Sequence, residues 1–253
     1  MGLRVGNTKI NGMQIFNKYP DGMSYEDFLN GVEPSGDFVI PSNFAFNSSR
    51  KCLVLRYTNL TSITYNGTDT SSYDYQGPFV GCKATRVDMP NITKLGWAFF
   101  QDLKLCTQFN LPKVTTVDRA AFQNCDSVVT LVLPSVVSVI NYVFKSTSLK
   151  TLDMGKLTSI GTNTNNTFNG CTVLDTMIIR TSSVATLHNI NCFTNTPFAS
   201  GGSGGTLYVP RSLIASYQSA SNWVTILGYE NNDIKAIEGS QYENYYADGT
   251  SIE

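Results

Sequence analysis

A 22-residue repeat is the most constraining feature of this chain. Pro90, Pro112 and Pro134 are equally spaced, and each follows a short apolar segment. An apolar residue comes two and five positions after each proline, and a phenylalanine comes ten positions after it, at Phe100 and its equivalents. Such a period is typical of solenoids, in which each repeat forms one turn and buries its apolar side against its neighbours.

The repeat extends in both directions with changes in spacing. We count about six repeats and a terminal strand, interrupted by polar inserts at 64–78 and 162–167. The pattern predicts parallel strands at 53–55, 87–89, 109–111, 131–133, 152–154, 177–179 and 207–209. The leucine-like positions favour a β-rich solenoid, a leucine-rich repeat stack with short parallel strands.

Alternation along each strand predicts which side chains face the core. In 131–133, Leu131 and Leu133 should point inward and Val132 outward. The repeat phenylalanines should close the core from the far side, and the apolar residues after each proline should start a second short strand or an extended turn. The outward row would consist of Val54, Asp88, Asn110, Val132, Asp153, Ile178 and Tyr208.

Composition restricts the class of partner. The net charge is −1 and only 15% of residues are charged, so charge alone attracts neither nucleic acid nor an anionic membrane. No apolar segment is long enough to cross a membrane. The first 16 residues lack a continuous apolar region, so we expect no signal peptide. Abundant Asn, Thr and Ser suit an extracellular or virion-exposed β-rich surface.

Residues with catalytic or metal-binding chemistry do not form a recognisable site. His188 is the one histidine and reads as a polar turn residue. Ser203 lies in a formal G-x-S-x-G match that lacks the preceding strand, the following helix and a later histidine. The six cysteines read as small buried residues; disulfides between turns are possible but not indicated, and no C-x-x-C pair suggests zinc. We therefore expect no enzymatic activity, no cofactor and no metal.

The two ends depart from the repeat, and we divide the chain into segments 1–36, 37–228 and 229–253. Residues 3–13 predict a β-hairpin with Gly-Asn and Asn-Gly turn signals, and 25–29 a short helix. The first segment caps the solenoid, attaches to another protein or is disordered. Residues 211–223 predict an amphipathic helix and 234–237 a closing strand, whereas the tail from Glu238 is expected to be mobile unless it binds something.

Two blocks of residues carry a resemblance to a known family. One is the motif Leu111-Pro112-x-Val114-Thr115-x-Val117 with Ala121-Phe122-x-Asn124-Cys125. The other is Leu207-Tyr208-Val209-Pro210 with Leu213, Tyr217 and Trp223, then Ile234-Lys235-Ala236-Ile237. The stretch from about 53 to 237 resembles the BspA-type leucine-rich repeats of bacterial surface proteins. This resemblance implies adhesion or recognition without an enzymatic site.

Residues 4–12 resemble the short openings of structural proteins from phages of gut bacteria. The leading hypothesis is therefore a non-catalytic component of a phage head or tail fibre, at the virion surface, attached to other virion proteins through residues 1–36. A homo-oligomer, a trimer in a fibre, is compatible with it. The alternative is a bacterial cell-surface adhesin, and an enzyme acting on glycans ranks third.

Two surfaces are candidates for binding a protein or a cell-surface glycan. One is the outward strand row, with Asp88, Asn110, Asp153 and Tyr208. The other is the 64–78 insert, with Tyr65, Tyr73 and Tyr75. Tyrosines give a large contact area at low entropy cost. We rank the insert first, because folding alone does not explain three tyrosines in a polar loop.

Overall fold

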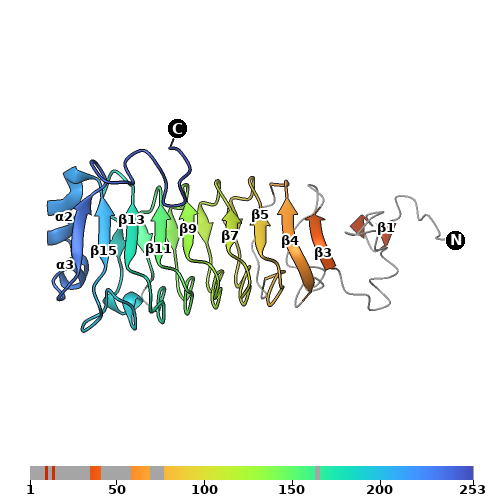
Figure 1. Ribbon diagram of the computed structural model, residues 1–253, viewed down its shortest axis with the longest axis horizontal. Helices are drawn as coiled ribbons and strands as arrows, with labels where there is room; N and C mark the ends of the chain where they lie inside the picture. Colours follow the sequence, from red (N-terminus) through yellow and green to blue (C-terminus); the bar gives the residue numbers. More distant parts are fainter. Residues whose placement is uncertain are drawn as a thin grey trace.

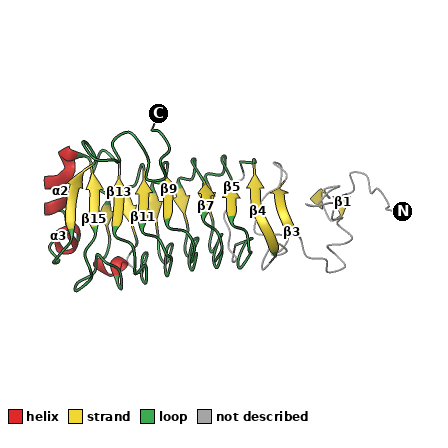
Figure 2. Ribbon diagram, viewed as in Figure 1, coloured by secondary structure: helices red, strands yellow, loops and turns green. Residues whose placement is uncertain are grey.

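The computed structural model describes residues 9–10, 13–14, 35–40, 58–68, 77–162 and 166–252. From Ser35 onward these residues coil into an elongated parallel β-solenoid of about seven turns, with helices at the C-terminal end (Figure 1; Figure 2). This confirms the predicted leucine-rich repeat stack.

One side of the solenoid, the strand side, carries the longer strands of the turns. The first group is β3 (Ser35–Ile40), β4 (Asn59–Tyr65), β5 (Arg86–Asp88) and β7 (Gln108–Asn110). The second group is β9 (Thr130–Leu133), β11 (Thr151–Met154), β13 (Thr176–Ile179), β15 (Thr206–Val209) and β16 (Asp233–Ala236). All neighbours within a group pair in parallel.

A second parallel sheet of two-residue strands forms another side, as the apolar residues after each proline predicted. Its strands are β6 (Lys94–Leu95), β8 (Thr116–Val117), β10 (Ser138–Val139), β12 (Ser159–Ile160) and β14 (Thr186–Leu187). This sheet is continuous from β6 to β14. In each strand the second residue is buried and the first faces outward.

Stacked phenylalanine rings form the centre of the core. The column contains one ring per turn, all fully buried: Phe79, Phe100, Phe122, Phe144, Phe168 and Phe193. Successive ring centroids are 5.9, 5.6, 5.6, 5.6 and 5.1 Å apart. The repeat phenylalanines therefore belong to the core, and each ring packs on its equivalent in the next turn.

Left-handed backbone positions recur on the third side, one turn apart. Asp102, Asn124 and Ser146 have φ of 59°, 58° and 55°, and Gly81 and Gly170 occupy equivalent positions. Glycine, Asn and Asp tolerate this region better than other residues. The N–H of Asp102 reaches the carbonyl of Gln123 in the next turn at 2.9 Å. Equivalent bonds tie the other turns together on this side.

The ends of the described chain are formed by a hairpin and by short helices. β1 (Lys9–Ile10) pairs antiparallel with β2 (Met13–Gln14), which confirms a hairpin at the Asn-Gly signal; the predicted helix at 25–29 lies outside the described residues. The predicted helix at 211–223 is interrupted. It consists of η4 (Arg211–Leu213) and α2 (Ile214–Ser219), and α3 (Trp223–Leu227) follows after Asn222, whose φ is 64°. The 3-10 helix η3 spans Ile190–Phe193.

The predicted neighbour of β5 was wrong. The strand that pairs with β5 is β4, with Ile63 opposite Val87, and β4 in turn pairs with β3. The prediction placed this strand at 53–55, with Leu60 and Ile63 as the second apolar pair of the same repeat. Residues 53–55, including Val54, lie outside the described residues. The long insert after β4 made the register ambiguous, because two apolar pairs fitted the same pattern.

The predicted row of strands is also not one continuous sheet. Among the described residues, no backbone pairing joins β7 to β9, although the second sheet continues past this point through β8 and β10. Phe109 of β7 occupies the inward position that is aliphatic in the neighbouring turns. Its ring lies 5.3 Å from Phe100 and 5.2 Å from Phe122, and it is only half-buried. We attribute the break to this larger side chain.

Burial along the strands confirms the predicted direction of Leu131, Val132 and Leu133. Farther along, the outward row is covered: Asp153 and Ile178 are fully buried. The cover is the C-terminal tail, which Figure 1 shows running back from β16 over the strand side toward the middle of the solenoid. The expectation of a mobile tail is therefore corrected, because the tail packs against its own chain.

The five described cysteines are buried free thiols, at positions 82, 106, 125, 171 and 192. Burial raises the pKa of each of them, and that of Cys106 to about 12. This environment agrees with their interpretation as small core residues rather than reactive thiols.

The Cys106 pKa makes stability depend on pH. Above about pH 9 an unfolded thiol loses its proton whereas the folded one keeps it, so the free energy of unfolding should fall as pH rises. From pH 9 to 10, Cys106 should contribute a loss of about 1 kcal/mol. We expect urea denaturation to show a shallower decline for Cys106→Ala, in a Cys52→Ser background. Equal slopes in the two proteins would contradict this.

Candidate functional site

The predicted binding residues separate into three groups in the structure. Asp88 and Asn110 lie side by side on β5 and β7, on a part of the strand side that remains open. Asp153 and Tyr208 lie under the C-terminal tail, so neither is a free contact residue. The prediction that Tyr65 lies in the insert is wrong, because Tyr65 is the last residue of β4 and is fully buried. Tyr73 and Tyr75 lie outside the described residues.

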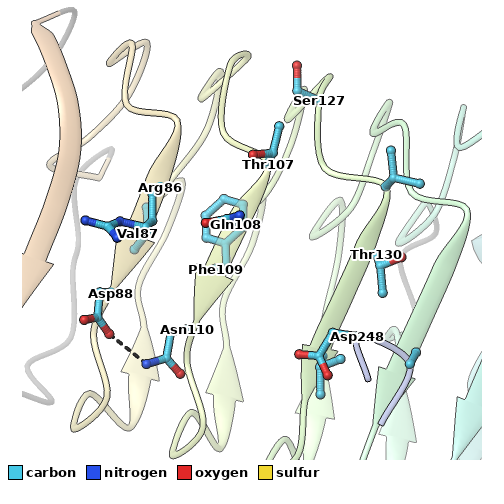
Figure 3. A pocket seen from close by; sticks show the side chains of 13 residues that line it. Arg86, Val87, Asp88, Thr107, Gln108, Phe109, Asn110, Ser127, Thr130 and Asp248 are labelled. Carbon is cyan, nitrogen blue, oxygen red and sulfur yellow. Dashed lines mark hydrogen bonds between the residues drawn. The ribbon is translucent and has the colours of Figure 1, made fainter. Parts of the chain in front are cut away.

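An open groove of about 730 Å³ lies where the sheet is interrupted (Figure 3). Its walls come from β5, β7 and β9, and the tip of the tail borders it. The lining residues are Arg86, Val87, Asp88, Thr107, Gln108, Phe109, Asn110, Ser127, Val129, Thr130, Val132, Ala247 and Asp248. The groove coincides with the missing pairing between β7 and β9, and Phe109 lines it.

The groove presents mixed chemistry. On one wall Asn110 Nδ2 donates to Asp88 Oδ1 at 2.7 Å, next to the exposed Arg86. On the other wall Val129 is 53% exposed, and the groove ends near Asp248. Figure 3 shows Asp88 and Asn110 on one side of the opening and Asp248 on the other. Donors, acceptors and apolar surface within one open groove suit a polypeptide, which offers all three kinds of contact.

A second cluster, which was not predicted from the sequence, anchors the tail. Arg180 Nε donates to Asp153 Oδ1 at 2.8 Å, and Nη2 donates to Asp153 Oδ2 at 2.7 Å. Burial raises the pKa of the Asp153 carboxyl, and the contacts with Arg180 oppose that shift. One signal was available in the sequence, since Arg180 stands at the strand end where Pro90, Pro112 and Pro134 stand in other repeats.

The residues considered for catalysis do not come together. His188 is exposed after β14, and Ser203 is exposed in a bend before β15. Within the described ranges, no group of three or more His, Cys, Asp or Glu side chains is placed to hold a metal ion. Over the same ranges no helix is long and apolar enough to cross a membrane.

Comparison with known families agrees with the fold. The model of the BspA type leucine rich repeat region matches residues 56–140 and 93–200, which together cover more than half of the chain. None of the curated proteins compared with the chain is significantly similar to it in sequence. Solenoids of this class are typically non-catalytic and generally bind proteins. From the repeat, the parallel solenoid and this match, we conclude that the chain belongs to the BspA-type leucine-rich repeat family.

Proposed function

We propose that this protein is a non-catalytic recognition module that binds a protein partner through the groove between β7 and β9. The observation that carries the proposal is the groove itself, which coincides with the part of the outward strand row that the tail leaves open. Solenoids recognise partners through such recurring faces. Asp88 and Asn110, which already belonged to the outward row, line this groove.

A polypeptide fits the groove better than a glycan does. Arg86, Asp88 and Asn110 offer hydrogen-bond donors and acceptors to the main chain of a polypeptide at the break between β7 and β9. Val129 and Val132 add apolar surface beside them. Sugar binding usually uses an open aromatic face, whereas the aromatic residue lining this groove, Phe109, is engaged with two core rings.

Site-specific cross-linking tests the groove. We expect a photo-cross-linking residue at position 110 to yield a covalent adduct with a second polypeptide, in the particles or cells that carry the protein. The same residue at Thr116, in the same turn but on the second sheet, is the matched control and should yield none. Val132→Arg should reduce the adduct at least tenfold, because a long cation enters the groove. Equal labelling from 110 and 116 would refute the proposal, as would labelling of glycan alone.

We further propose that the module acts on the surface of a phage particle. The support is the resemblance of residues 4–12 to openings of phage structural proteins. In this arrangement residues 1–36 attach to other virion proteins, and the repeats face the host or its surroundings. A bacterial cell-surface adhesin with the same groove is the alternative. Neighbouring genes for capsid or tail proteins support the particle, whereas neighbouring genes for a sortase or lipoprotein system support the adhesin.

A further inference from the structure

We propose that the strand side over β11, β13 and β15 is a second polypeptide-binding site, which reads the main chain of an extended tyrosine-containing segment and is occupied by the protein's own tail. This site is separate from the groove. Its basis is the way in which one buried ion pair holds residues 242–247.

The ion pair is directed at backbone atoms of the tail. Arg180 uses two of its three remaining N–H groups on carbonyls of the tail, with Nη1 donating to Tyr242 O at 2.7 Å and Nη2 to Tyr245 O at 2.9 Å. Asp153 Oδ2 accepts from the backbone N–H of Ala247 at 3.0 Å. These contacts use main-chain atoms of the tail and not the side chains at the three positions. They therefore select a conformation of the main chain.

Aromatic contacts supply the sequence preference. The ring of Tyr242 packs edge-on against Tyr208, with centroids 4.9 Å apart. The guanidinium of Arg180 lies over the ring of Tyr246 at 5.1 Å. Cation–π and aromatic contacts of this kind each contribute on the order of 1 kcal/mol. The preferred ligand is therefore a segment with two tyrosines four residues apart.

The tail covers the ion pair and completes its hydrogen bonds. With the tail in place, the side chains of Arg180 and Asp153 are 11% and 0% exposed. A charge pair at this depth is unfavourable unless further hydrogen bonds satisfy it, and here the tail makes them. Without the tail, the pair would offer donors and an acceptor to another extended segment.

The tail also borders the groove, because Ala247 and Asp248 line it. A partner segment that replaced the tail would gain a continuous surface from β7 to β15. A tethered tail competes at an effective concentration on the order of millimolar, so only a tighter or multivalent partner replaces it.

Cutting the tail free in the folded full-length protein tests the proposal. A protease site is inserted between Glu238 and Gly239, which are both exposed, and the folded protein is cleaved. A fluorescent synthetic peptide of residues 239–253 is then added, and its binding is followed by anisotropy. We expect the peptide to exchange into the cut protein, and to bind the uncut protein at least a hundredfold more weakly.

Peptide variants keep the test independent of protein folding. N-methylation at Ala247 removes the N–H that Asp153 accepts, and Tyr242→Ala removes the ring contact, so each should weaken binding at least tenfold. Asn244→Ala changes an exposed side chain and is the matched control, with binding expected to be unchanged. A peptide that fails to bind at 1 mM would overturn the proposal. Equal binding of cut and uncut protein, or of the N-methylated and unmodified peptides, would also overturn it.

Discussion

Replacing Phe144 by alanine should lower the free energy of unfolding by about 3–5 kcal/mol. Phe144 is fully buried, and its ring stacks between Phe122 and Phe168, 5.6 Å from each. Truncation removes both contacts and leaves a cavity that two fixed neighbouring turns cannot fill. Urea denaturation followed by circular dichroism measures the loss.

The control for Phe144 is an exposed apolar residue in the same part of the solenoid. Val137 is 37% exposed, so Val137→Ala should change stability by no more than about 0.5 kcal/mol. Turns of a solenoid interact mainly with their neighbours, so the Phe144 variant should also show a broader transition as cooperativity weakens. If Phe144→Ala lowers the free energy of unfolding by less than about 1 kcal/mol, the column of rings does not stabilise the core.

Asp153→Ala should cost about 3–5 kcal/mol and release the tail. The substitution removes the acceptor for Arg180 and for the N–H of Ala247, and it leaves a mostly buried guanidinium without its counter-charge. Hydrogen exchange should show loss of protection in residues 242–252, whereas the amides of β5 and β7 stay protected. Global stability is read from urea denaturation of the same samples.

An exposed ion pair provides the comparison. Lys104 Nζ lies 3.6 Å from Asp126 Oδ2, and the two side chains are 61% and 47% exposed. Asp126→Ala should therefore lower the free energy of unfolding by at most about 1 kcal/mol. The isosteric Asp153→Asn keeps an acceptor but removes the charge, and we expect an intermediate cost. If Asp153→Ala costs no more than Asp126→Ala, the buried pair does not anchor the tail.

Much of the fold was predictable because the information is periodic. The 22-residue spacing placed the strands near 87–89, 109–111 and 131–133, and the structure has them within one residue. The inward positions and the phenylalanine column followed from alternation and from the same spacing. These features depend on contacts between equivalent residues of adjacent turns. Each repeat therefore carries the same pattern of inward-facing apolar residues.

The candidate groove was only partly predictable. Asp88 and Asn110 were recognised as outward residues, and the structure keeps them together on open strands. The break between β7 and β9 was not foreseen, because Phe109 fits the apolar pattern as well as a leucine does. Only the structure shows that this ring packs against Phe100 and Phe122 at the point where the pairing is interrupted.

The sequence by itself determined the solenoid, its strand phase and its family, since these rest on a repeated local pattern. The tertiary structure alone decided which part of the outward row is open. Arg180 contacts the tail 62 and 65 positions away, and Asp153 contacts it 94 positions away. These contacts occur once and leave no periodic signal. Their physical cause is a buried charge pair that must satisfy its hydrogen bonds, and only the folded chain shows that the tail does so.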